Sequence, residues 1–221
     1  MEYKIRERPR RLSGAEQKRL LLECFKRFHK QNPHPHCELF YKTQFQVLVS
    51  VVLSAQTTDK SVNESMRPLY EKGFSLETVL HLGEVGIYEK IRKIGLAKSK
   101  AKYVYGLSQI LHDKHHGQVP HTREELEALP GVGRKTASVV LGELFGQPTL
   151  AVDTHVFRVG KRLALHKEST PEKAEKALLK VIPKEFLPRA HHWFVLHGRY
   201  ICKAIKPRCE ICPLNDICPS L

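Results

Sequence analysis

The sequence predicts an all-α fold, and three observations support this class. Short polar residues that cap helices recur along the chain, each followed by apolar residues three and four positions apart. Glycine and proline separate these segments. No stretch contains several period-two strands joined by hairpin turns. We therefore expect about ten helices.

The first helices begin at recognisable caps. Ser13 and Glu16 form a capping box, in which each side chain satisfies a free backbone N–H, and a helix over residues 14–30 follows. Thr43 opens a second helix with one apolar face, and Asp59 is the expected cap of the third.

The later helices have similar start and stop signals. The starts are Ser75, Thr122 and Ser169, and the stops are Gly95, Gly117 and Gly146. Gly106 has two interpretations, a helix end or a helix interior that needs close packing.

Composition and charge narrow the function classes. The chain has 221 residues, with 37 Lys and Arg against 23 Asp and Glu, a net charge of +14. A partner of opposite sign is expected, and nucleic acid is the most abundant intracellular polyanion, although such a charge can also serve solubility alone. No apolar run approaches the ~20 residues of a membrane helix, and residues 1–13 resemble no signal peptide. We expect a cytoplasmic protein with no membrane role.

Residues 129–137 predict a phosphate-binding bend between two helices. Gly131 and Gly133 permit unusual backbone angles and leave N–H groups unshielded, while the Val132 side chain can pack. A bend followed by a helix N-terminus can hold a phosphate oxygen. An ordinary tight turn is the alternative for these two glycines alone.

Lys135 lies in the first turn of the following helix, beside Arg134. The positive helix end and the neighbouring guanidinium both favour the uncharged amine. Such an amine can form a Schiff base, whereas an ordinary surface lysine is only a phosphate contact. Position alone does not separate the two roles.

Asp153 follows a short apolar stretch and precedes a predicted helix. An N-cap role, worth ~1 kcal/mol, explains an aspartate at this position. A second role is compatible with the first, because a carboxylate beside a reacting sugar stabilises positive charge at the anomeric carbon.

Four cysteines near the C-terminus have the spacing C-x6-C-x2-C-x5-C. They are Cys202, Cys209, Cys212 and Cys218. Zinc and a 4Fe-4S cluster both accept four thiolates, and the single close pair with wide flanking spacers favours the cluster. Cys24 and Cys37 lie far upstream and are expected to be buried or incidental thiols.

Several longer strings extend these motifs. They are LSAQTTD at 53–59, IGLAKSKA at 94–101, LPGVGRKTA at 129–137, VDTHVFR at 152–158, HHWFVLHGRYIC at 191–202, and the complete cysteine loop. Together they resemble the endonuclease III branch of the helix-hairpin-helix DNA glycosylases. The resemblance implies a base excision repair enzyme that removes oxidised pyrimidines from duplex DNA and nicks 3′ to the abasic site by β-elimination. It also implies a 4Fe-4S cluster, a monomer, and association with the bacterial nucleoid.

The resemblance assigns roles to particular residues. Lys135 matches the Schiff-base lysine, Asp153 the essential aspartate, and residues 131–133 the phosphate-binding hairpin. Gln56 matches a residue that fills the gap left by an extruded nucleotide, and Leu96 a wedge into the base stack. The expected contacts to the DNA backbone are Arg134 and three cations between the first two cysteines, Lys203, Lys206 and Arg208.

By the same resemblance, a six-helix barrel spans residues 42–148 and ends in the hairpin. Residues 1–41 and 149–221 form the cluster domain, with Lys135 and Asp153 facing each other across a groove. Two alternatives remain: a mismatch-specific uracil or thymine glycosylase of the same superfamily, and a non-catalytic DNA-binding protein stabilised by a metal. An adenine-mismatch glycosylase is disfavoured by Lys135.

Overall fold

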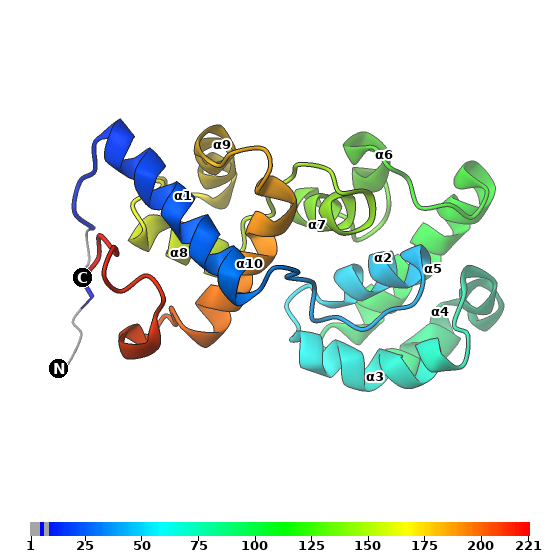
Figure 1. Ribbon diagram of the computed structural model, residues 1–221. Coiled ribbons are helices and arrows are strands. Elements are labelled where there is room, and N and C mark those ends of the chain that lie inside the picture. Colours follow the sequence, from blue (N-terminus) through cyan, green and yellow to red (C-terminus); the bar gives the residue numbers. More distant parts are fainter. Residues whose placement is uncertain (1–4, 7–8) are drawn as a thin grey trace. The chain divides into compact units, whose positions relative to one another are not determined.

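A computed structural model describes residues 5–6 and 9–221 (Figure 1). The described residues form ten α-helices and one short 3-10 helix, with no strand, which confirms the all-α class. The chain divides into two compact units, Cys37–Gln147 and a second one built from the residues before Cys37 and from Pro148–Leu221. The first unit begins five residues before Lys42, where the sequence predicts the barrel to start. None of the described helices is long and apolar enough to cross a bilayer.

The Cys37–Gln147 unit contains six helices. They are α2 (Gln44–Leu53), α3 (Asp59–Glu71), α4 (Leu76–Ile91), α5 (Ala97–His115), α6 (Arg123–Glu127) and α7 (Arg134–Phe145). All residues of α2 after Gln44 are buried, and the helix packs against α3, α5 and α7. Its apolar sequence therefore supplies the centre of this unit's core.

Two glycines have different roles in the long helices. Gly83 has φ +63° and kinks α4, a break that we did not predict from the sequence. Gly106 lies inside α5, where a Cβ would come within 3.3 Å of Pro130 Cγ. Gly106 therefore allows close packing against the segment that follows α6, and it does not mark a helix end.

The other unit contains the remaining helices. They are α1 (Gly14–Gln31), α8 (Thr154–Arg162), α9 (Pro171–Val181), α10 (Leu187–Tyr200) and the 3-10 helix η1 (Cys209–Ile211). Phe25 of α1 stacks on Phe186 at a ring distance of 5.0 Å and meets Trp193 of α10 at 5.6 Å. The indole N–H of Trp193 donates to the Asn32 carbonyl at 2.9 Å, so Trp193 is a core residue with a satisfied polar group.

Most predicted caps are correct, and two are displaced by one residue. The capping box of Ser13 and Glu16 is complete. Thr58 caps α3 in place of Asp59, and Thr170 caps α9 in place of Ser169. In both cases a threonine stands immediately before the first helical residue, where its hydroxyl reaches the third backbone N–H. Asp59 becomes the first residue of α3, where a carboxylate is favourable beside the helix N-terminus.

Candidate functional site

The turn between α6 and α7 combines exposed glycine backbone with a buried, hydrogen-bonded residue, Val132. Val132 is only 5 % exposed and its N–H donates to the Leu129 carbonyl at 3.1 Å. Gly131 has φ +77°, and a Cβ there would lie 2.8 Å from Tyr103 Cβ. Gly133 is the N-cap of α7 and provides no side-chain cap. The first turn of α7 therefore begins at exposed glycine backbone, the arrangement that binds anions at helix N-termini.

Lys135 is the second residue of α7 and is exposed, next to the equally exposed Arg134. Arg123 of α6 supports this turn of helix, because its Nη1 donates to Ser138 Oγ at 3.1 Å and to the Arg134 carbonyl at 3.3 Å. We did not predict this role of Arg123 from the sequence. The Glu127 carboxylate four residues later pairs with it, and that i, i+4 spacing was the available signal.

Gln56 and Leu96 have the same unusual backbone conformation. Both are exposed non-glycine residues with positive φ, +54° and +61°. Left-handed conformations of this kind are costly for residues with a Cβ and are enriched at functional positions. Leu96 is 59 % exposed although it is apolar.

The loops that carry these two residues touch. Lys100 of α5 donates from Nζ to Thr57 Oγ1 at 2.5 Å, and Thr57 adjoins Gln56. Gly95 lies so near the other loop that a Cβ there would be 3.5 Å from the same hydroxyl. Burial lowers the pKa of Lys100. The fold thus brings Gln56 and Leu96, forty residues apart in the sequence, to neighbouring loops of one unit.

Asp153 is the N-cap of α8, and its Oδ1 accepts from the Val156 N–H at 2.8 Å. The side chain is half-buried. The capping role is therefore present, and it occupies one carboxylate oxygen. Asp153 and Lys135 belong to different units of the chain, and their facing across a groove stays a prediction.

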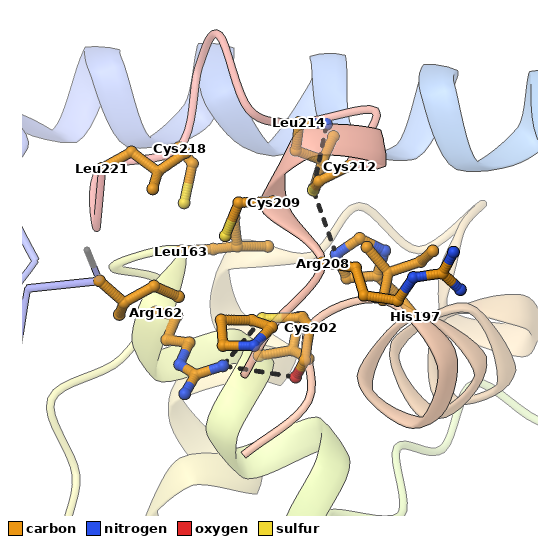
Figure 2. A pocket seen from close by; sticks show the side chains of 14 residues that line it. Arg162, Leu163, His197, Cys202, Arg208, Cys209, Cys212, Leu214, Cys218 and Leu221 are labelled. Carbon is orange, nitrogen blue, oxygen red and sulfur yellow. Dashed lines mark hydrogen bonds between the residues drawn. The ribbon is translucent and has the colours of Figure 1, made fainter. Parts of the chain in front are cut away.

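The four C-terminal cysteines line one cavity (Figure 2). Apolar side chains, among them Val159, Leu163 and Leu214, complete much of its wall. Hydrogen-bonding groups reach the sulfurs: Arg162 Nη1 lies 3.3 Å from Cys202 Sγ, the Leu214 N–H lies 3.4 Å from Cys212 Sγ, and His197 Nε2 lies 3.8 Å from Cys212 Sγ. An apolar cavity with four thiols and N–H donors suits an iron-sulfur cluster.

Burial affects the protonation of the thiols that line this cavity. Within the described part of the chain, no three His, Cys, Asp or Glu side chains form a group that could hold a single metal ion. Burial raises the pKa of Cys212 to about 12, and it raises the pKa of Cys209 and Cys218 as well. Ligation must therefore displace protons from these thiols.

The segment between the first two cysteines forms a closed basic loop. The Arg208 N–H donates to the Ile201 carbonyl at 2.9 Å, which brings the two ends of the loop together. Its cations, Lys203, Lys206 and Arg208, are all exposed. Ile205 at its tip is 82 % exposed. Cys24 is buried on α1 and Cys37 is half-buried in the other unit, so neither lines the cavity.

Two arginines of α8, which we did not predict from the sequence, bind the residues at the start of this loop. Arg158 donates from Nε to the Cys202 carbonyl at 3.0 Å and from Nη2 to the Gly198 carbonyl at 2.8 Å. Arg162 contacts the same cysteine and the residues after it. Their spacing of four residues places both on one face of α8, but nothing in the sequence connects that face to a loop forty residues away.

Comparison with known proteins identifies the family. Residues 49–184 match the model of the HhH-GPD superfamily base excision DNA repair proteins, and residues 202–218 match the iron-sulfur binding domain of endonuclease III. Endonuclease III of Rickettsia felis is 52 % identical over 202 residues, which are 91 % of this chain and 95 % of that protein. The chain belongs to the endonuclease III family.

Other relatives agree with this assignment. Endonuclease III of Escherichia coli K12 is 48 % identical over 197 residues, which cover 89 % of this chain and 93 % of that protein. A solved non-covalent endonuclease III–DNA complex superposes with a TM-score of 0.85 at 42 % identity, covering 94 % and 96 % of the two chains. A thermostable thymine-DNA glycosylase, at 21 % identity and a TM-score of 0.76, shares the fold.

Membership in the endonuclease III family establishes the general activity. The protein is a base excision repair DNA glycosylase and AP lyase that binds DNA and carries a 4Fe-4S cluster. The superfamily match includes the hairpin and Asp153, and the iron-sulfur match begins at Cys202 and ends at Cys218. The hairpin, the segment around Asp153 and the cysteine loop therefore lie inside the matched regions, whereas most of the string at 191–202 lies between the two regions.

Proposed function

We propose that this endonuclease III family member excises oxidised pyrimidines from duplex DNA with Lys135 as its nucleophile, and cleaves the strand 3′ to the resulting abasic site. The observation that carries the proposal is the exposed Lys135 amine in the first turn of α7, directly after the uncapped glycine turn. A phosphate held at that turn would bring the sugar of the same strand toward the amine.

The chemistry begins with the uncharged Lys135 amine. Its lone pair attacks C1′ of the deoxyribose, the bond from C1′ to the base breaks, and the base departs with that electron pair and a proton. Asp153 stabilises the positive charge that develops on the sugar, as carboxylates do in glycoside hydrolysis.

Strand cleavage follows from the imine. Opening of the sugar ring gives a Schiff base between Lys135 and C1′, which acidifies the C2′ hydrogens. Loss of a C2′ proton expels the 3′ phosphate by β-elimination, and water then hydrolyses the imine and frees the amine. One lysine thereby links base removal to strand cleavage.

Access to C1′ requires the nucleotide to leave the base stack, which costs a few kcal/mol and less for a damaged base. We assign Leu96 as the wedge and Gln56 as the residue that fills the vacated space. Their exposed, strained backbone on two touching loops supports these roles. Both residues are exposed, so their side chains are accessible to DNA.

DNA backbone contacts come from the hairpin, Arg134 and the basic loop. The hairpin glycines accept a phosphate without reading sequence, and the three loop cations add electrostatic contacts. We assign Cys202, Cys209, Cys212 and Cys218 as the cluster ligands. The cluster supplies a structural cross-link that stiffens the basic loop. We also propose a monomer that acts in the cytoplasm on the bacterial nucleoid.

A single-turnover panel tests the substrate class. Duplexes contain thymine glycol, an oxidised cytosine, uracil or thymine opposite guanine, or an abasic site, and base release and strand cleavage are scored in parallel. We expect the oxidised pyrimidines to be released fastest, with cleavage coupled to release. Preferential release of mismatched uracil or thymine would support the mismatch glycosylase instead, and binding without release from any duplex would support the non-catalytic protein.

A further inference from the structure

Arg162, the last residue of α8, points its guanidinium at the start of the basic loop (Figure 2). Nη1 donates to the Lys203 carbonyl at 2.7 Å and to Cys202 Sγ at 3.3 Å. Nη1 also reaches the Cys202 carbonyl at 3.4 Å, and Nη2 donates to the Ala204 carbonyl at 3.1 Å. One side chain therefore holds three successive carbonyls and one sulfur.

The backbone carbonyl of Arg162 is held by a residue near the C-terminus. Ser220 Oγ donates to the Arg162 carbonyl at 2.7 Å, and the Ser220 side chain is fully buried. The Ser220 carbonyl in turn accepts from the Arg6 N–H at 2.9 Å. Arg162 thus starts from a fixed backbone, which limits how far its guanidinium can move away from Cys202.

The charge of Arg162 is not neutralised by a carboxylate within the described part of the chain: its acceptors there are the sulfur and the three carbonyls. Arg158 is different, because it donates to the carbonyl oxygens of Cys202 and of Gly198 in α10. Arg162 is the arginine whose N–H group is directed at a cysteine sulfur.

We propose that Arg162 is a positioning residue of the iron-sulfur centre, which fixes Cys202 and the basic loop and raises the reduction potential of the cluster. This inference rests on the ligand set in the proposed function. An N–H donor and a positive charge at a ligating sulfur withdraw electron density, and so favour the more reduced state of the cluster. A cluster that is harder to oxidise loses iron more slowly.

The test compares three variants with the wild-type holoenzyme. Arg162→Gln removes the charge and most of the donors. Arg162→Lys retains the charge and loses the planar fork. Lys161→Gln is the matched control, because Lys161 is the exposed neighbour on α8 and its ammonium group lies over the Phe157 ring instead of the cysteine sulfurs. The cluster potential is measured by protein-film voltammetry, and iron release to a chelator by loss of visible absorbance.

We expect Arg162→Gln to lower the potential and to release iron about 10-fold faster, the usual scale for removing a partner of a metal ligand. Arg162→Lys should have a reduction potential nearer to that of wild type than Arg162→Gln has, but should release iron faster than wild type. Lys161→Gln should match wild type in reduction potential and in the rate of iron release. A potential and release rate of Arg162→Gln equal to those of Lys161→Gln would overturn the inference.

If Arg162→Gln does not assemble a cluster, the test rests on Arg162→Lys. A wild-type reduction potential together with a wild-type rate of iron release in Arg162→Lys would overturn the inference. Wild-type protein purified with stoichiometric zinc and no iron would overturn the inference at its premise, because the same four thiolates would then hold an ion that has no reduction potential to tune. An iron-loaded wild type with an insensitive Arg162→Gln defeats only the role of Arg162.

Discussion

Replacing Gly131 with alanine should destabilise the Cys37–Gln147 unit far more than the same change at Gly133. At Gly131 the alanine must adopt φ +77°, and its Cβ would lie 2.8 Å from Tyr103 Cβ. A left-handed residue with a Cβ costs about 1–2 kcal/mol. The clash adds the cost of overpacking, about 1–3 kcal/mol. The expected loss in the free energy of unfolding is about 2–5 kcal/mol.

The clash cannot be relieved by a change of rotamer, because the nearest atom is the Cβ of Tyr103 and moves only with the backbone of α5. Gly133 is the matched control within the same turn. Its φ is −96°, and a Cβ there would meet no atom within 4 Å. Alanine in place of glycine at this N-cap should cost at most about 1 kcal/mol.

Urea unfolding followed by far-UV circular dichroism measures both losses, and hydrogen exchange of the α7 amides shows whether the effect is local. Trp193, the single tryptophan, lies in the other unit, so its fluorescence reports that unit separately. Equal destabilisation by the two alanines, or a larger effect at Gly133, would refute the steric account of the hairpin.

Three further predictions concern the other unit. Asp153→Ala should lower the free energy of unfolding by about 1 kcal/mol because the helix cap is lost. Asp153→Asn should keep the wild-type free energy of unfolding but slow base release in single turnovers. A wild-type rate of base release by Asp153→Asn would leave only the capping role. Burial lowers the pKa of His166 from 6.5. Below pH 6.5 the unfolded state therefore binds more protons than the folded state, and the free energy of unfolding falls as the pH falls. A His166→Gln variant should show a weaker dependence of this free energy on pH in urea titrations, and an unchanged dependence would contradict the prediction. Removing iron with a chelator should speed hydrogen exchange in residues 202–218 but not in α7, and uniform acceleration would count against a local structural role.

The helices and the chemical motifs were predictable because their signals are local. Ser13 and Glu16 act within one turn of helix, and the cysteine spacing limits the ligand chemistry without knowledge of the fold. The one-residue errors at Asp59 and Ser169 arose because adjacent residues could each cap, and only the backbone angles select one of them.

The features that could not be predicted depend on contacts between distant segments. The bond from Lys100 to Thr57 that joins the two loops spans 43 positions, and the bond from Arg162 to Cys202 spans 40. The kink at Gly83 was also missed, because a glycine within a helical pattern indicates reduced helix propensity but not its actual backbone angles.

The most direct test of the central claim is borohydride trapping on duplex DNA that contains thymine glycol, followed by mass spectrometry of the adduct peptide. Reduction of the imine should leave a stable covalent bond between the sugar and Lys135, and Lys135→Ala should abolish trapping while Lys176→Ala, a change at an exposed lysine of α9, should not. Undiminished trapping by Lys135→Ala, or an adduct mapped to a different residue, would contradict the assignment of the nucleophile.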